Sequence, residues 1–220
     1  HLLQDFPEVT KYTSKPTALF SNTQIENPNL MLEGMPNYRS GVDGLRVSNS
    51  TKGGITFAAS TTQNGIHMIT VVLGVEAVDG DPYARFVATS SLMNYVVRTF
   101  VSSIVVKEGD PYGKSKATVM DGKSETVLAV AKKDFYIVEK QGSQAEPKIQ
   151  FKSDQESFRA PVKSGTNLGK LHYTDPDKIG RGYLEDQEPT VDMVAGRTIE
   201  KSFFLKVWWN EFVRYVNEKL

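Results

Sequence analysis

The stretch GITFAASTTQNGIHMITVVL, from Gly54 to Leu73, decides the fold of the first part of this chain. Two runs rich in β-branched and apolar residues, 54–60 and 66–73, flank a polar connection, and its Asn64-Gly65 step is a strong hairpin signal. Both runs carry apolar residues on both faces. We therefore expect two paired strands in the interior of a sheet rather than at its edge.

A long helix is predicted directly after this hairpin. Pro82 suits a first helical turn, and the stretch from Tyr83 to about Phe100 gathers its larger apolar side chains roughly on one side. A strand hairpin followed by a long helix is typical of a sheet that is covered by helices.

The charge density changes near the middle of the chain. Residues 1–100 hold 7 basic and 8 acidic side chains, whereas residues 101–220 hold 19 and 18. Short β-type runs separated by turn-rich pieces then predict a small antiparallel β-sandwich. These runs are 104–106, 117–119, 126–130, 135–138, 148–151, 168–173 and 190–194.

Composition excludes several classes of function. The 220 residues contain no cysteine, which removes disulfide scaffolds, cysteine-based zinc sites and thiol nucleophiles, and fits an exported Gram-positive protein. His67 and His172 lie in β-type runs, where we interpret them as strand residues, so we expect no metal site and no cofactor. Lys plus Arg equals Asp plus Glu at 26 each, which argues against a global polyanion-binding surface or a nucleic-acid partner, although a local basic patch stays open.

The last residues, 201–220, predict an amphipathic helix. One interpretation is a helix docked on the protein's own core. The other is a helix lying in a membrane surface, favoured by both tryptophans of the protein falling on the apolar arc. Spanning is disfavoured by Lys206, Glu211 and Arg214 along the middle. The predicted membrane-binding side chains are Phe204, Leu205, Trp208, Trp209, Phe212, Val213 and Val216.

Several stretches, taken together, resemble one family. The segments 1–7, 38–45 and 65–74, the β-rich part 102–195 and the tail 201–220 are similar to the carboxyl half of low-molecular-weight penicillin-binding D-alanyl-D-alanine carboxypeptidases from Gram-positive bacteria. The resemblance implies an α+β fold: a partial transpeptidase-like α/β sheet region, an antiparallel β-sandwich and a C-terminal amphipathic helix. The expected boundaries are 1–101, 102–198 and 199–220.

The resemblance also implies acyl transfer by a serine in a Ser-x-x-Lys box, helped by a Ser-x-Asn motif and by a Lys-Thr-Gly strand that binds the substrate carboxylate. Neither of the first two motifs occurs in these 220 residues. Where the third is expected, the chain has Arg46, Val47 and Ser48. Arg46 keeps a positive charge, Val47 lacks the hydroxyl, and Ser48 adds a side chain where glycine allows close approach. Ser50 fits the family pattern.

Three interpretations follow. The chain could be the carboxyl half of a carboxypeptidase that trims peptidoglycan stem peptides and is inactive without an amino-terminal catalytic segment. It could instead be a non-catalytic relative, a cell-wall-binding or scaffolding protein at the membrane surface. An unrelated membrane-surface β-domain, with Arg46 as an ordinary strand cation, is the third. The family implies the extracellular face of the cytoplasmic membrane as the location, with peripheral attachment.

Overall fold

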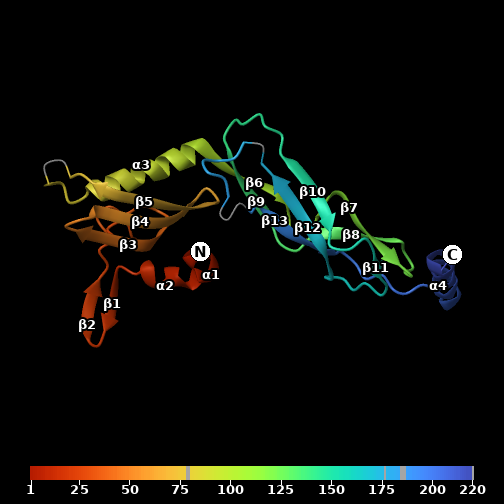
Figure 1. Ribbon diagram of the computed structural model, residues 1–220. Coiled ribbons are helices and arrows are strands. Elements are labelled where there is room, and N and C mark those ends of the chain that lie inside the picture. Colours follow the sequence, from red (N-terminus) through yellow and green to blue (C-terminus); the bar gives the residue numbers. More distant parts are fainter. Residues whose placement is uncertain (78–79, 176, 184–186, 220) are drawn as a thin grey trace. The chain divides into compact units, whose positions relative to one another are not determined.

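The computed structural model describes residues 1–77, 80–175, 177–183 and 187–219 (Figure 1). It divides into two compact units, an amino-terminal unit (His1–Ser102) and a carboxyl-terminal unit (Ser103–Leu220). The predicted α+β class is confirmed, because helices occur with mostly antiparallel strands. The finer predicted boundaries, including a separate segment 199–220, stay a prediction.

The amino-terminal unit is built on a three-stranded antiparallel sheet in the order β3-β4-β5, with helix α3 packed on one face. The β4–β5 hairpin and α3 are the predicted ones, and Asn64 and Gly65 take the positive φ angles that such a tight turn requires. The elements are α1 (Leu2–Asp5), η1 (Pro7–Val9), α2 (Thr10–Thr13), β1 (Thr17–Phe20), β2 (Thr23–Glu26), β3 (Val42–Ser50), β4 (Gly54–Gln63), β5 (Ile66–Val75) and α3 (Ala84–Thr99).

The prediction that both hairpin strands are interior is wrong for β5. Strand β4 lies between β3 and β5, whereas β5 is an edge of the sheet within the described residues. On β5 the buried and exposed side chains alternate, so that Ile69, Val71 and Leu73 are exposed. The apolar residues on this face of β5 are suited to burial, but no element among the described residues covers them.

The carboxyl-terminal unit is a curled β-sandwich. A six-stranded sheet has the order β10-β12-β13-β8-β7-β11, and β6 pairs with β9 in a second, two-stranded sheet. Each predicted run forms a strand, and the short strand β11 departs from the antiparallel pattern by pairing parallel with β7. The elements are β6 (Phe100–Val106), β7 (Pro111–Met120), β8 (Thr126–Ala131), β9 (Phe135–Lys140), β10 (Lys148–Ser153), β11 (Phe158–Arg159), β12 (Asn167–Thr174), β13 (Thr190–Ala195) and α4 (Phe204–Lys219).

Strand alternation generates the core of the sandwich. On β8, Val127, Ala129 and Ala131 are buried, while Leu128 and Val130 between them are exposed and half-buried, respectively. Because successive side chains of a strand point to opposite faces, each strand supplies one set to the core and one set to the outer surface. The largest fully buried side chains of this core are Leu168, Leu171, Met193, Val127 and Val191.

Candidate functional site

Strand β3 carries the altered motif on an edge of the three-stranded sheet. It pairs antiparallel with β4, so that Arg46 lies opposite Ala58 and Val47 opposite Phe57. Val47 packs against the core of the unit, whereas Arg46 and Ser48 are exposed. The two-residue period of the strand thus presents the first and third motif positions to solvent and turns the second inward.

A groove of about 420 Å³ lies beside β3. One wall is the β3 segment that includes Arg46 and Val47, and the other is formed by the residues around α2 and the β1–β2 hairpin. Lys15 and Arg46 bring two cations to the groove, against the carboxylate of Glu26. A cationic groove of this kind suits a ligand with a carboxylate group. The lining residues are Tyr12, Lys15, Thr17, Ala18, Ile25, Glu26, Asn27, Pro28, Leu45, Arg46 and Val47.

Side-chain amides hold the walls of this groove together. The amide nitrogen of Asn27 donates to the carbonyl of Thr13 at 3.0 Å, and the buried amide of Asn29 donates to the carbonyl of Gly44 at 3.2 Å. A Cβ atom at Gly44 would lie 2.6 Å from Oγ1 of Thr13, so α2 can approach the start of β3 only if this residue is glycine. These contacts therefore fix the backbone of α2 and of the start of β3, which form the walls of the groove.

Ser48 lines a neighbouring cavity of about 310 Å³ together with Arg85 of α3. Arg85 is buried, and its guanidinium donates to the carbonyls of Ser48 at 3.0 Å and Thr56 at 3.2 Å, and to Oδ1 of Asn49. Burial lowers the pKa of this guanidinium below its usual value. These three bonds tie α3 to the carboxyl end of β3 and to the start of β4. Sequence reasoning missed Arg85, although a charged residue in a stretch with a predicted apolar side was a usable signal.

Ser50 lies apart from both cavities. Its hydroxyl accepts a hydrogen bond at 2.8 Å from the backbone nitrogen of Gly53 in the β3–β4 turn. The structure therefore brings Arg46 and Val47 to the groove, places Ser48 in the adjacent cavity, and gives Ser50 a turn-stabilising contact. Of the predicted strand histidines, His67 has its Nε2 atom 2.9 Å from the hydroxyl of Ser60.

Helix α4 presents its apolar side chains to solvent. Of the seven predicted membrane-binding residues, six are exposed and Val216 is half-buried. The polar Asn210 instead lies toward the sandwich, with its amide 3.5 Å from Oδ1 of the buried Asp121, and Lys206 lies 4.0 Å from Glu125. The interpretation of a helix whose apolar arc is buried in its own core does not describe this arrangement. The side chains of Glu211 and Arg214 lie outside the described set.

No helix among the described residues has both the length and the apolar character needed to cross a bilayer.

The carboxyl-terminal unit is the part of the chain that matches a known protein family. Residues 100–201 match the family description "Penicillin-binding protein 5, C-terminal domain". A D-alanyl-D-alanine carboxypeptidase, DacA of Haemophilus influenzae, is 26% identical over 174 residues, which are 79% of this chain and 42% of that protein.

Solved structures extend the similarity to the amino-terminal unit. A peptidoglycan synthesis regulatory factor (PBP3) from Streptococcus pneumoniae is 44% identical, with a TM-score of 0.85, over 90% of this chain and 54% of that protein. The carboxyl-terminal unit thus matches the penicillin-binding protein 5 family, and the chain as a whole is similar to low-molecular-weight penicillin-binding proteins. Penicillin-binding protein 5 of Haemophilus influenzae, 23% identical with a TM-score of 0.58 over 91% of this chain and 54% of that protein, shares the fold.

The chain spans about half the length of these penicillin-binding relatives. The predicted family is confirmed, and so is the predicted succession of sheet region, sandwich and terminal helix. The roles of Arg46, Val47, Ser48 and Ser50 as a substrate-binding strand, and of the tail as a membrane anchor, stay predictions.

Proposed function

We propose that this chain forms the carboxyl-terminal half of a D-alanyl-D-alanine carboxypeptidase that acts on peptidoglycan stem peptides. The observation that carries the proposal is the position of β3. The motif residues lie on an edge strand, beside a groove with two cations, and the fold around them is that of a penicillin-binding relative 44% identical in sequence. In this role Arg46 pairs with the terminal carboxylate of the peptide.

The catalytic step requires groups that these 220 residues do not contain. In the proposed reaction a serine hydroxyl attacks the carbonyl carbon of the penultimate D-alanine, the bond to the terminal D-alanine breaks, and the leaving amine takes up a proton. Water then hydrolyses the acyl-enzyme. Since the chain holds no Ser-x-x-Lys and no Ser-x-Asn sequence, we propose that it is inactive alone and that an amino-terminal catalytic segment is its partner.

The altered motif weakens substrate binding in this proposal. Arg46 supplies charge but its guanidinium does not release a proton near pH 7, and Val47 offers no hydroxyl to the carboxylate. Ser48 adds a side chain at a position where glycine admits a close backbone contact. We therefore expect a complete protein with Arg46-Val47-Ser48 to be slower than one with Lys-Thr-Gly.

A chimaera tests this proposal. The amino-terminal half of the Streptococcus pneumoniae relative is joined to residues 1–220, once with the present motif and once with Arg46→Lys, Val47→Thr and Ser48→Gly. D-alanine release and labelling by a fluorescent penicillin are measured for both. The restored motif is expected to give clear activity and the present motif much less. A folded chimaera that stays inactive with the restored motif contradicts the proposal.

The second candidate is a non-catalytic relative that binds the cell wall or scaffolds partners at the membrane surface. The three changes within one motif favour it, together with the exposed apolar side chains of α4. In both candidates we propose a peripheral location on the extracellular face of the cytoplasmic membrane, reached through α4. A chimaera with the present motif that binds purified peptidoglycan but releases no D-alanine would favour this candidate.

A further inference from the structure

The outer face of the six-stranded sheet is rich in lysine. Strand registers place Lys152 of β10 directly opposite Lys170 of β12, and Lys170 opposite Asp192 of β13. The amine of Lys132, just after β8, lies 3.4 Å from the carboxylate of Asp192. These four residues form a row across neighbouring strands with three cations and one carboxylate, which pairs with Lys132.

The pair of lysines at one end of the row is unfavourable for the fold. Residues directly opposite in an antiparallel pair have Cα atoms about 4.5–5.5 Å apart, and like charges there destabilise the sheet. Within the described part of the chain, neither Lys152 nor Lys170 forms an ion pair. Desolvation first, and then Lys152 and Lys170, lower the pKa of the neighbouring His172, against an opposing effect of Glu188. The register thus places two positive charges side by side on this face.

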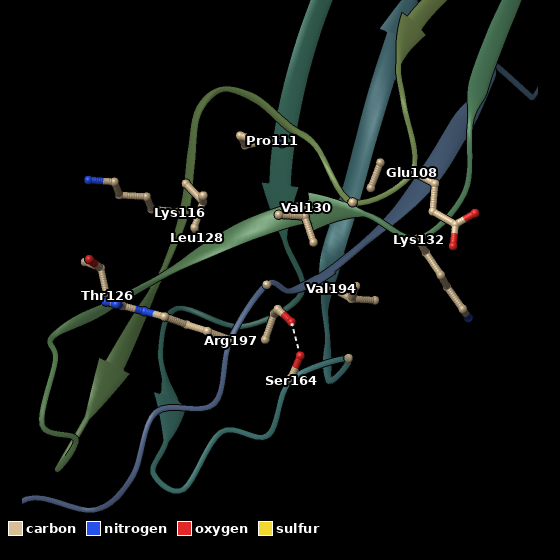
Figure 2. A pocket seen from close by; sticks show the side chains of 15 residues that line it. Glu108, Pro111, Lys116, Thr126, Leu128, Val130, Lys132, Ser164, Val194 and Arg197 are labelled. Carbon is tan, nitrogen blue, oxygen red and sulfur yellow. Dashed lines mark hydrogen bonds between the residues drawn. The ribbon is translucent and has the colours of Figure 1, made fainter.

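The row continues into a cavity of about 840 Å³ on the same sheet (Figure 2). Leu128, Val130 and Val194 contribute an apolar surface, and the carboxylate of Glu108 lies at the side of Lys132. Lys116 and Arg197 add two further cations to this cavity. At about 4.8 Å between strands, the basic residues from β10 to β7 span roughly 19 Å along the sheet.

We propose that this outer face, defined by Lys116, Lys132, Lys152, Lys170 and Arg197, binds a linear anionic polymer whose charges are phosphate groups. Because the face carries several cations, charge complementarity favours a ligand with several negative charges. Four of the five side chains that define the face are lysines, which protein interfaces avoid at their centres, and Leu128 is its exposed large apolar residue among those described. Lysine amines act as point charges for phosphate, and several of them along one surface suit a chain of such groups.

The lysine face and the exposed aromatic residues of α4 lie on different elements. Lys152 and Lys170 lie on β10 and β12, whereas the exposed aromatic residues Trp208 and Trp209 lie on α4. A polymer site and a membrane-surface site therefore predict separable losses of binding in variants of the full 220-residue chain.

The test uses linear inorganic polyphosphate as the probe. The variant K116Q/K152Q/K170Q is compared with K11Q/K52Q/K107Q, which removes the same charge from exposed lysines elsewhere. Each lysine of the face is expected to contribute roughly fivefold, so the first variant binds about 100-fold more weakly. The slope of log affinity against log salt falls by about 2 because fewer counterions are released. The control variant and W208S/W209S keep the affinity of the original chain.

Further arms assign the occupant. The variant K152R/K170R retains Lys116 and keeps the charges of the face. It should bind polyphosphate like the original chain, which shows that the loss in the glutamine variant is not misfolding. Equal loss in the control variant overturns the proposal, since binding would then depend on net charge alone. Equal affinity of polyglutamate for the same lysines overturns it in favour of an acidic protein segment. Lysine-dependent binding of W208S/W209S to phosphatidylglycerol vesicles, with no binding of polyphosphate, overturns it in favour of a lipid surface.

Discussion

The Nη1 atom of Arg85 donates to the carbonyl oxygen of Ser48 at 3.0 Å, and this bond joins helix α3 to the last residue of the altered motif. The same guanidinium binds the carbonyl of Thr56 and the side chain of Asn49. The buried guanidinium is thus bound by oxygens on two neighbouring strands, two of them backbone carbonyls, and by no carboxylate among the described residues. Arg85 therefore connects α3 to both strands at the end of the motif.

Replacing Arg85 with methionine should destabilise the amino-terminal unit. The variant removes the guanidinium donor from the part-buried carbonyls of Ser48 and Thr56, and only the Ser48 carbonyl keeps another donor, the hydroxyl of Thr56. Since a group left unsatisfied costs about 1–3 kcal/mol, we expect the free energy of unfolding to fall by roughly 1–3 kcal/mol. Urea titration followed by hydrogen exchange at β3 and β4 amides measures the change. The exposed Arg98, at the other end of α3, is the matched control, and equal loss in Arg98→Met contradicts this role.

The amino-terminal unit should be the less stable of the two. Within the part of the chain that the structure describes, its sheet ends at β3 and β5 and leaves Ile69, Val71 and Leu73 exposed. The sandwich instead encloses its core between two sheets. Native-state hydrogen exchange should find slower exchange in β8, β12 and β13 than in β3, β4 and β5. Equal protection in both units would argue that the exposed face of β5 costs the fold nothing.

The isolated chain should form no acyl adduct with penicillin, even when the motif is restored by Arg46→Lys, Val47→Thr and Ser48→Gly. The restored strand binds a carboxylate but supplies no activated serine, because the 220 residues lack the Ser-x-x-Lys box. Intact-mass measurement after incubation with a β-lactam checks this. Stoichiometric labelling that hydroxylamine removes would reveal a nucleophile outside the family pattern.

Much of the fold could be predicted because its strands are short, alternating and separated by turn residues. The Asn64-Gly65 hairpin and the sandwich strands follow from local pattern alone. Strand β5 shows where this reasoning ends. Apolar residues on both faces indicate burial, yet burial depends on what covers the sheet, and Leu73 lies uncovered among the described residues. Local periodicity contains no information on the covering element.

The candidate site was only partly predictable. Arg46, Val47 and Ser48 came from a resemblance over consecutive residues, and the structure places all three at or beside the groove. Arg85 lies 37 positions from its partner Ser48, and no spacing rule links them. The lysine row is similar, since Lys152 and Lys170 become neighbours only through strand register. A net charge of zero for the whole chain does not reveal a local row of this kind.

Lowering the pH should destabilise the carboxyl-terminal unit through His172. Desolvation and the nearby Lys152 and Lys170 lower the pKa of this imidazole in the folded state. Between the folded value and the unfolded value of about 6.5, the unfolded chain binds more protons, so stability rises with pH across that window and is lost as pH falls through it. His172→Gln should flatten this dependence in thermal unfolding, and Lys170→Gln should reduce it. An unchanged profile in both variants contradicts the coupling.

The tail provides the last prediction: α4 should bind membranes lying in the plane of the surface. A helix of this length extends about 24 Å at 1.5 Å per residue, but a charge at the bilayer centre costs up to about 3.5 kcal/mol, and Glu211 and Arg214 stand near the middle of its sequence. Lying flat keeps Lys206 in water while Trp208, Trp209 and Phe212, exposed in the structure, enter the interface.

Changing Trp208 and Trp209 to serine should therefore weaken binding to mixed lipid vesicles by roughly 100-fold, because each indole buries on the order of 50 Å² of apolar surface at the interface, which is about 2.5 kcal/mol for the pair. Vesicle flotation at low and high salt measures this, and the loss should depend weakly on salt because apolar area drives the binding. Tyr38→Ser with Tyr136→Ser, two exposed aromatics away from α4, is the matched control. If the tryptophan variant floats with vesicles like the original chain while the sandwich stays folded, another surface holds the membrane.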